Sequence, residues 1–416
     1  MKLTKNRYRI DGRKITIFGA GKIGRSFIGQ LFGNAGYKVV FIDINPVIVD
    51  RLNSRQYYRI IIKGERDEEI IVRSVEAVMF SDTKNVVDNI ATASIIAISV
   101  GKNVLENVIP VIAAGLETRY RINKERPLDI IIAENMRSAA DFVREQLKKH
   151  LPLEYPFEKL VGLVETSIGK MVPIMTSAEL EKDPLLVYAE PYNTLILDGK
   201  GFKSPIPDIK GLAPKDNIKA WVDCKAFIHN LGHATAAYYG FYVDPSAVYL
   251  YEVLANEKVL KFTREVMLQS ADILKAVYPS EFTDTQLADH IEDLLSRFGN
   301  KALRDTVFRV GHDLTRKLSI NDRFLGAIRL GIRFGMPYDK ILTAMSYGFC
   351  FRATDDEKRF FPPDIDFLEL LSKDFESGLK KFLALDPLTD QTIIKELKME
   401  YSTLKHPDEK LYSEGQ

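Results

Sequence analysis

Three residues that could do chemistry together lie close in an apolar segment, CKAFIHNLGH (224–233). On an α-helix, at about 100° per residue, Asn230 and His233 fall about 140° and about 80° from Lys225, so the three side chains share one sector. A helix break near Gly232 would bring them closer still. Burying such polar groups without partners costs roughly 2 kcal/mol or more each, so they either face solvent or serve a function.

This set suits the oxidation of an alcohol without a metal. A lysine with a lowered pKa can take the hydroxyl proton as hydride leaves. An asparagine can donate to the oxygen as negative charge develops, and a histidine can orient the hydroxyl or relay the proton. A solvated lysine beside a core histidine explains the spacing equally well.

A glycine pattern near the N-terminus, FGAGKIGRSFIG (18–29), matches G-x-G-x-x-G between a strand-like run and a helix-like run. Such glycines permit a tight turn, the approach of a pyrophosphate and close helix–strand packing, while the helix N-terminus donates N–H groups to phosphate. The predicted cofactor loop comprises Gly19, Ala20, Gly21, Lys22, Ile23 and Gly24.

Asp43 ends the next strand-like run, and its carboxylate could accept from both ribose hydroxyls and repel a 2′-phosphate. NAD is therefore favoured over NADP. Val100 and Gly101 follow another strand-like run, where folds of this kind bind the nicotinamide side. FAD, a nucleotide-sugar ligand, or a purely structural turn with a solvated Asp43 stay open as alternatives.

The bulk composition excludes several classes of protein. The 416 residues carry 58 Lys and Arg against 57 Asp and Glu, without the basic surplus of a dedicated nucleic-acid binder. Two cysteines cannot form a disulfide framework, the N-terminus shows no signal peptide, and no apolar run approaches the ~20 residues of a membrane span. We expect a cytoplasmic protein without membrane or nucleic-acid partners.

The first half of the chain alternates strand-like and helix-like segments, which indicates a parallel sheet covered on both faces. The expected strands are 14–19, 38–43, 94–100, 128–135 and 160–167, with helices near 22–36, 103–121 and 136–150. The segment 56–75 has two β-rich arms around KGERDEE and predicts a hairpin at the sheet edge.

The segment 199–217 holds three glycines and three prolines and marks a domain boundary. Beyond it only helical patterns follow, at 216–239, 252–278, 284–297, 301–317, 321–334, 338–349 and 364–383. The polar end from about His406 is expected to fray. The sequence thus predicts a Rossmann-type α/β domain over 1–203 and an all-helical substrate domain over 204–416.

Several segments resemble the polyol-specific long-chain dehydrogenases/reductases. The pattern K-x4-N-x2-H matches the family signature, and the opening GAGKIGRSFIG is most similar to the branch that acts on mannitol 1-phosphate. Further similar segments are ISVGKNVLENVIPVIAAGL (98–116), IIIAENM (130–136), FKSPIPDIKGL (202–212), GHATAAYYG (232–240), RKLSINDR (316–323) and FRATDD (351–356).

The resemblance implies an NAD-dependent, metal-independent oxidation of a secondary alcohol to a ketone by a protein that is expected to be a monomer. By the matched motifs, Lys225 would be the general base. Asn230 and Asn135 would polarise the reacting oxygen, His233 would orient the substrate and Arg352 would contact it.

The substrate is predicted from RKLSINDR, where Arg316, Lys317 and Arg323 suit a phosphate monoester. Cations that favour a helix C-terminus are the alternative explanation. The phosphate interpretation implies mannitol 1-phosphate and fructose 6-phosphate. Unphosphorylated mannitol, a hexuronate, a 6-phosphogluconate-type hydroxy acid and a non-catalytic NAD-binding sensor are the competing hypotheses.

Three departures from the family pattern stand out. The family element V-D-R-[IV]-x-P is replaced by IGKMVP, with Gly169 and Lys170 in place of the Asp-Arg pair. Lys22 stands where asparagine is usual, and the first 13 residues form an extra arm. The replaced pair puts substrate detail or contacts between the domains in question, whereas the proposed base and oxygen donors are intact.

Overall fold

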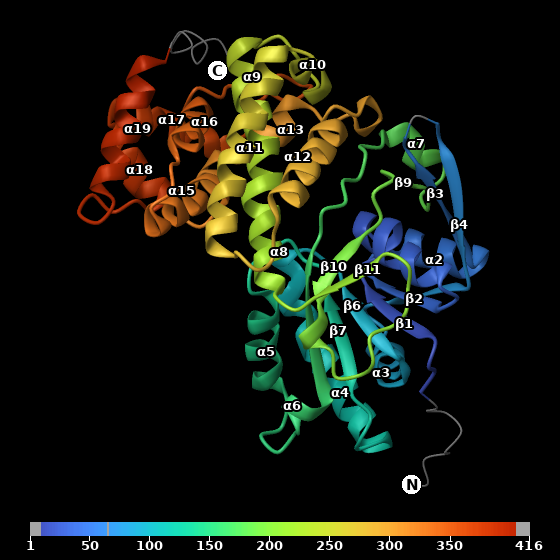
Figure 1. Ribbon diagram of the computed structural model, residues 1–416. Helices are drawn as coiled ribbons and strands as arrows, with labels where there is room; N and C mark the ends of the chain where they lie inside the picture. Colours follow the sequence, from blue (N-terminus) through green and yellow to red (C-terminus); the bar gives the residue numbers. More distant parts are fainter. Residues whose placement is uncertain (1–9, 65, 405–416) are drawn as a thin grey trace. The chain divides into compact units, whose positions relative to one another are not determined.

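The computed structural model describes residues 10–64 and 66–404, which form two compact units divided between Val222 and Asp223 (Figure 1). The division falls within helix α8 (Ile218–Cys224), whereas the boundary expected from the sequence between 203 and 204 stays a prediction. Most of the predicted N-terminal arm and the expected frayed end lie outside the described residues.

An eight-stranded sheet with the order β11-β10-β8-β7-β6-β1-β2-β5 forms the centre of the N-terminal unit. Its strands are β1 (Lys14–Phe18), β2 (Lys38–Asp43), β5 (Val75–Met79), β6 (Ile95–Ile98), β7 (Leu128–Ile132), β8 (Val161–Ser167), β10 (Leu195–Asp198) and β11 (Leu212–Lys215). All neighbours pair in parallel except β10 with β8. The five predicted strands are confirmed as β1, β2, β6, β7 and β8.

Both faces of this sheet are buried, which explains why its strands are continuous apolar runs. Alternate residues point to opposite faces: Ile15 and Ile17 enter one core cluster and Phe18 the other. The helices of the unit are η1 (Gly24–Gly29), α1 (Gln30–Asn34), α2 (Pro46–Arg55), α3 (Thr83–Thr92), α4 (Leu105–Ile122), α5 (Ala139–His150), α6 (Phe157–Leu160) and α7 (Ser177–Lys182).

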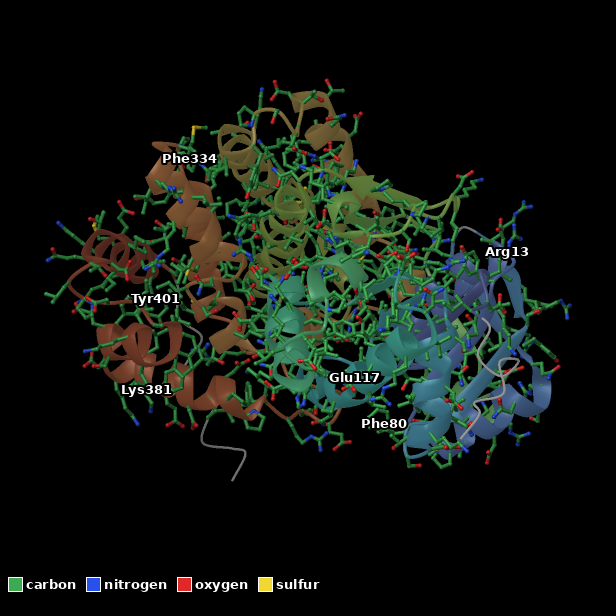
Figure 2. All side chains as sticks on the ribbon, turned by 90° about the horizontal axis from the view of Figure 1, so that it is seen from below. Arg13, Phe80, Glu117, Phe334, Lys381 and Tyr401 are labelled. Carbon is green, nitrogen blue, oxygen red and sulfur yellow. The ribbon has the colours of Figure 1, made fainter. Side chains whose placement is uncertain are left out.

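Helices α3, α4 and α5 supply one of these clusters, and the η1–α1 helix supplies the other. Helix α4 carries Glu117 (labelled in Figure 2), which pairs with the exposed Arg121 at 2.9 Å. The predicted parallel sheet with helices on both faces is therefore confirmed.

The predicted hairpin is confirmed as β3 (Tyr57–Ile62) and β4 (Glu68–Arg73), which pair antiparallel. Its expected place at the edge of the main sheet was wrong. Together with β9 (Val187–Ala189) the hairpin forms a separate three-stranded sheet, because the buried side of β3 packs into the same core cluster as β1. The edge strands of the main sheet are β5 and β11 instead.

The C-terminal unit is helical in its described part. After the end of α8 its helices are η4 (Lys225–Asn230), α9 (Leu231–Val243), α10 (Leu250–Leu254), α11 (Glu257–Val277), α12 (Asp284–Phe298), α13 (Val307–Gly311), α14 (Leu314–Lys317), α15 (Arg323–Phe334), α16 (Asp339–Phe349), α17 (Pro362–Lys373), α18 (Phe375–Leu383) and α19 (Gln391–Thr403). The predicted order of an α/β domain followed by a helical domain is confirmed (Figure 1).

Helix α9 is the central helix of this unit, since most of its residues are buried and α10, α11, α13 and α16 all contact it. Small residues allow the close approach: a Cβ on Gly232 would lie 2.4 Å from the Met267 sulfur. The helix runs unbroken through Gly232, so it does not contain the break that would have brought Lys225 and His233 closer.

The predicted single helix over 301–317 is also wrong. It is interrupted at Arg304 and Asp313, whose φ values of 53° and 70° lie in the left-handed region and end the local helical turns. Helix α19 was not predicted from the sequence. Within the described residues, no helix is long and apolar enough to cross a bilayer.

Candidate active site

The glycine loop joins β1 to the η1–α1 helix and leaves one side of its backbone open. Gly19 has a φ of +92°, and a Cβ there would lie 2.4 Å from the Ser99 carbonyl oxygen. A Cβ on Gly24 would lie 2.0 Å from the Gly19 oxygen, whereas one on Gly21 would meet no atom within 4 Å. The first and third glycines therefore serve close packing, and the second leaves space for a ligand, as a pyrophosphate loop requires.

Asp43 closes this loop from the end of β2. One carboxylate oxygen accepts from the Ala20 N–H at 2.7 Å, and the other accepts from the Asn45 N–H at 2.8 Å. The carboxylate is partly exposed, and each oxygen keeps a second lone pair for another donor. Within the loop Ala20 is buried, Ile23 is half-buried and Lys22 is exposed.

Arg25 holds the glycine loop by a hydrogen bond to its backbone. It was not predicted from the sequence, because its other partner, Leu185, lies 160 residues away. Its buried guanidinium donates to the carbonyls of Ala20 at 2.7 Å and Leu185 at 2.6 Å. Burial lowers the pKa of Arg25. η1 is a π-helical turn, and the Tyr58 hydroxyl donates to the Arg25 carbonyl at 2.8 Å, which satisfies an acceptor in that wider turn.

The loop after β6 is held by a second residue that was not predicted, Glu134. One carboxylate oxygen of Glu134 accepts from the N–H groups of Val100 at 2.7 Å and Gly101 at 2.9 Å. Burial raises the pKa of Glu134, although these two donors act against the shift. Since both N–H groups donate to Glu134, Val100 and Gly101 can contact a cofactor only through their other atoms.

Asn135 directly follows Glu134 and is exposed at the carboxyl end of β7. Because β7 lies between β6 and β8 in the parallel part of the sheet, Asn135 emerges at the same edge as the Val100–Gly101 loop. The glycine loop opens at this edge too, since β1 pairs in parallel with β6. The predicted cofactor residues and Asn135 are thus gathered at one edge of one unit.

In the C-terminal unit the predicted base lies on a π-helical turn, η4, that spans Lys225 to Asn230. Hydrogen bonding from residue i to i+5 in such a turn places Asn230 above Lys225, so the uniform α-helical spacing expected from the sequence was wrong. The wider turn frees carbonyls for outside donors. The Ser270 hydroxyl donates to the Phe227 carbonyl at 2.6 Å, and Arg323 donates to the Asn230 carbonyl at 3.2 Å.

The charge state of Lys225 is set by its surroundings. Burial and the positive charge of Arg323 lower the pKa of Lys225 to about 8, against a smaller opposing effect of Asp322. The Asn230 side chain is half-buried and makes no hydrogen bond with a described residue, so its amide can donate to a ligand. A proton acceptor and an amide donor therefore share one helical turn.

His233 lies further along the same helix and contacts residues that were not predicted. Its ring stacks on Phe298 with centroids 4.6 Å apart, and its Nε2 lies 3.4 Å from a carboxylate oxygen of the buried Asp305. The other Asp305 oxygen pairs with Arg309. Burial lowers the pKa of His233, although Asp305 acts to raise it.

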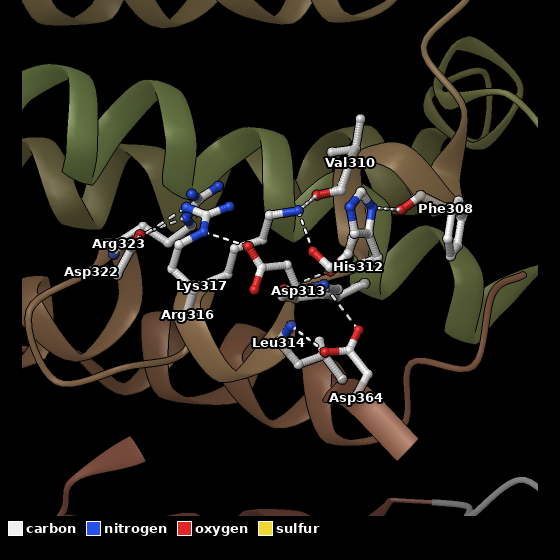
Figure 3. Close-up of polar contacts among 12 residues, drawn as sticks. Phe308, Val310, His312, Asp313, Leu314, Arg316, Lys317, Asp322, Arg323 and Asp364 are labelled. Atoms are coloured by element: carbon white, nitrogen blue, oxygen red, sulfur yellow. Dashed lines mark hydrogen bonds and ion pairs between the residues drawn. The ribbon is translucent and has the colours of Figure 1, made fainter. Parts of the chain in front are cut away.

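The two arginines of the predicted phosphate site share one carboxylate (Figure 3). Arg323 donates from Nε to Asp322 at 2.8 Å, and an Arg316 nitrogen lies 3.6 Å from the other Asp322 oxygen. Arg316 also pairs with Asp313 and is half-exposed, whereas Arg323 is buried. Arg323 therefore acts on two residues of η4: its charge lowers the pKa of Lys225, and it donates to the Asn230 carbonyl.

Lys317 points in another direction (Figure 3). Its buried ammonium donates to the carbonyls of Val310, at 2.6 Å, and His312. Burial and the charges of Arg323 and Arg316 hold the pKa of Lys317 well below its usual range. These contacts stabilise the turn between α13 and α14 and use the Lys317 ammonium within the fold.

Arg352 is also placed apart from Lys225. One of its nitrogens donates to the carbonyls of Phe349 and Phe351, both at 2.9 Å. The side chain lines a cavity of about 1080 Å³ together with Phe241 at the C-terminal end of α9. Because α9 runs for 13 residues, or about 20 Å, this cavity lies at the opposite end of the helix from Lys225.

The departure at Gly169 and Lys170 has a structural account within the N-terminal unit. The buried Lys170 ammonium donates to the side-chain oxygens of Asn193 at 2.7 Å and Gln30 at 3.1 Å. It also lies 5.1 Å from the centre of the Phe27 ring. Lys170 therefore joins the η1–α1 helix to the segment before β10.

No group of three or more His, Cys, Asp or Glu side chains in the part of the chain that the structure describes is placed to hold a metal ion. The groups described above that could accept a proton or donate to an oxygen are the side chains of Lys225, Asn230 and Asn135. Two of the buried carboxylates near the predicted site residues, Glu134 and Asp305, are engaged by backbone amides and by an arginine respectively.

Comparisons with known proteins identify both halves of the chain. Residues 13–211 match the family model described as the mannitol dehydrogenase Rossmann domain, and residues 217–376 match the mannitol dehydrogenase C-terminal domain.

Two solved structures share the fold over nearly the whole chain. A D-sorbitol dehydrogenase in substrate-free form is 16% identical, with a TM-score of 0.76, 95% of this chain and 94% of that chain covered. The Pseudomonas fluorescens mannitol 2-dehydrogenase in ternary complex with NAD and D-mannitol is 14% identical, with a TM-score of 0.71, 96% of this chain and 93% of that chain covered.

Proposed function

The chain belongs to the mannitol dehydrogenase family, and on this premise we propose that it interconverts a sugar-alcohol phosphate and a ketose phosphate, with mannitol 1-phosphate and fructose 6-phosphate as the substrate pair. It is an NAD-dependent oxidoreductase that acts on a CH–OH group. The observation that carries the proposal is Lys225, whose pKa is lowered to about 8 on a turn shared with Asn230 and next to Arg323.

Two observations in the N-terminal unit support NAD as the cofactor. The open side of Gly21 admits a pyrophosphate, and Asp43 holds two lone pairs for ribose hydroxyls after binding Ala20 and Asn45. Bound NAD supplies the hydride acceptor. Glu134 fixes the loop of Val100 and Gly101 beside it.

The chain's own residues handle the proton and the oxygen. Neutral Lys225 takes the proton of the reacting hydroxyl, and the Asn230 amide donates to the oxygen as negative charge develops. His233 orients the substrate, and Asn135 in the N-terminal unit stays a prediction as a further donor to the reacting oxygen. In the reverse direction, protonated Lys225 returns its proton to the oxygen of the ketose.

The phosphate assignment rests on the arginine pair. Arg316 and Arg323 bring two guanidinium groups together at the carboxylate of Asp322, and Arg316 also pairs with Asp313. Arg323 adjoins the turn that carries Lys225. Guanidinium groups suit the planar, bidentate recognition of phosphate oxygens.

The test is a parallel assay of NADH formation with mannitol 1-phosphate, mannitol, altronate and 6-phosphogluconate. We expect the highest kcat/KM with mannitol 1-phosphate. A preference for altronate would support a hexuronate enzyme, and equal rates with mannitol would remove the phosphate role. If none of the four is oxidised while NAD still binds, the protein would be a sensor.

Replacement of Asp43 by alanine should weaken NAD binding and relax the discrimination against NADP. Hydrogen bonds to a charged group contribute about 1.5–3 kcal/mol, so we expect the KM for NAD to rise roughly tenfold to a hundredfold. Steady-state kinetics with both cofactors checks this. An unchanged ratio of kcat/KM between NAD and NADP would exclude the ribose contact.

A further inference from the structure

The contact between His233 and Asp305 has no role in the chemistry described so far. The His233 Nε2 and the Asp305 carboxylate oxygen lie 3.4 Å apart, and both atoms are buried. Neither atom hydrogen-bonds to any other residue that the structure describes. Buried polar atoms are nearly always satisfied, so each of these two atoms has the other as its available partner.

Asp305 can act only as an acceptor in this pair. Burial raises the pKa of Asp305, but the contact with His233 and the charge of Arg309 outweigh that effect and leave the pKa below its usual value. An ionised carboxylate has no proton to donate. The proton between the two side chains must therefore sit on the Nε2 of His233.

His233 is neutral near pH 7, because burial lowers its pKa. A neutral imidazole carries one N–H, and the hydrogen bond of one nitrogen decides which nitrogen has it. With Nε2 protonated toward Asp305, Nδ1 is an acceptor. The stacking on Phe298, with an interplanar angle of 18°, restrains the ring from exchanging its two nitrogens.

We propose that Asp305 is a positioning residue that fixes His233 as the Nε2–H tautomer. The Nδ1 of His233 can then recognise a substrate hydroxyl by accepting a hydrogen bond from it. This inference rests on the proposed function and specifies its substrate class. The hydroxyl that is oxidised transfers its only proton to Lys225, and its oxygen accepts a hydrogen bond from the Asn230 amide. It therefore has no hydrogen left for Nδ1.

His233 must then bind a different hydroxyl of the same molecule. The substrate class is a polyol with a second hydroxyl close to the carbon that is oxidised, and a simple secondary alcohol lacks this group. The ketose product keeps the second hydroxyl, so the contact persists in both directions of the reaction. Asp305 thus selects for vicinal hydroxyls without touching the substrate.

The first test measures the tautomer directly by 15N NMR of the full-length protein labelled at histidine. The His233 signals are assigned by their loss in a His233→Ala variant. We expect the Nε2–H form in the wild type and a shift to the Nδ1–H form in Asp305→Asn, since the asparagine amide can donate to Nε2. A wild-type ring in the Nδ1–H form would overturn the inference, whatever the substrate.

The second test is a double-mutant cycle on kcat/KM with mannitol 1-phosphate and its two analogues that each lack one of the hydroxyls flanking the oxidised carbon. Asp305→Asn should lower kcat/KM for the full substrate roughly tenfold to a hundredfold. It should have little effect on one of the two deoxy analogues and none in the His233→Ala background. Equal losses in all of these cases would mean a merely structural role for Asp305.

Arg309→Met is the matched control, because it removes the other partner of Asp305 and leaves the contact with His233. We expect it to change kcat/KM by less than about threefold. If it reproduced the loss in Asp305→Asn, the ion pair rather than the tautomer would be responsible. Failure of the proposed function would be recognised separately, since the wild type would then oxidise no polyol.

Discussion

Replacement of Lys225 by methionine should abolish alcohol oxidation while NAD binding is nearly retained. General-base catalysis by a positioned side chain contributes typically about 10²–10⁴-fold, and kcat should fall by that factor. Methionine keeps most of the side-chain volume on the π-helical turn, so the fold should persist. NADH formation and titration of NAD by fluorescence measure the two effects separately.

The matched control is Lys219→Met, which removes an exposed lysine from α8, the helix that leads into the same turn. This variant should keep wild-type kcat. Activity of Lys225→Met within tenfold of the wild type would disprove its role as the base.

The same lysine sets the pH dependence of the reaction. Lys225 must be neutral to accept a proton, and burial together with Arg323 lowers its pKa to about 8. The rate of polyol oxidation should therefore rise with pH and level off above about 8, and the rate of ketose reduction should fall over the same range. A flat profile for oxidation, measured with saturating cofactor, would contradict the assignment.

Replacement of Arg316 and Arg323 together by methionine should remove the preference for a phosphorylated substrate. Charged hydrogen bonds contribute about 1.5–3 kcal/mol each, so kcat/KM for mannitol 1-phosphate should fall by roughly a hundredfold or more. Activity with unphosphorylated mannitol should fall less, by the part of the loss that comes from the effect of Arg323 on the pKa of Lys225 and on the Asn230 carbonyl. The measurement is the ratio of kcat/KM for the two substrates.

The single variant Arg316→Met gives the cleaner result, because Arg316 is half-exposed and Arg323 also holds the Asn230 carbonyl. Arg333→Met, an exposed arginine near the end of α15, serves as the control and should leave both substrates unaffected. Equal losses for phosphorylated and unphosphorylated mannitol would assign the arginines to structure.

The local patterns of the sequence were sufficient for the fold class, whereas the roles of the two chemical segments that they indicated stay predictions. The glycine spacing after β1 and the carboxylate at the end of β2 predicted a loop whose geometry suits a pyrophosphate. The Lys–Asn–His spacing predicted a helix with three functional groups. The hairpin was recognised too, but its location was not, because pairing with β9 joins segments far apart in the chain.

The same limit explains the residues that were not predicted. Glu134 binds amides 33 and 34 residues away, and Arg25 binds a carbonyl 160 residues away. Nothing in the sequence near Lys317 shows that its ammonium is bound to two carbonyls. Burial and hydrogen-bond partners of this kind depend on tertiary packing, whereas spacing along a helix or strand does not.

The sequence alone determined which residue types lie on which element, because helix and strand periodicities follow from local backbone geometry. Only the tertiary structure decided their chemical states. It converted the Lys225–Asn230 segment into a π-helical turn, lowered the pKa of Lys225 and faced Asp305 toward His233. These effects arise from desolvation and from charges brought together by folding, and neither can be read from residue order.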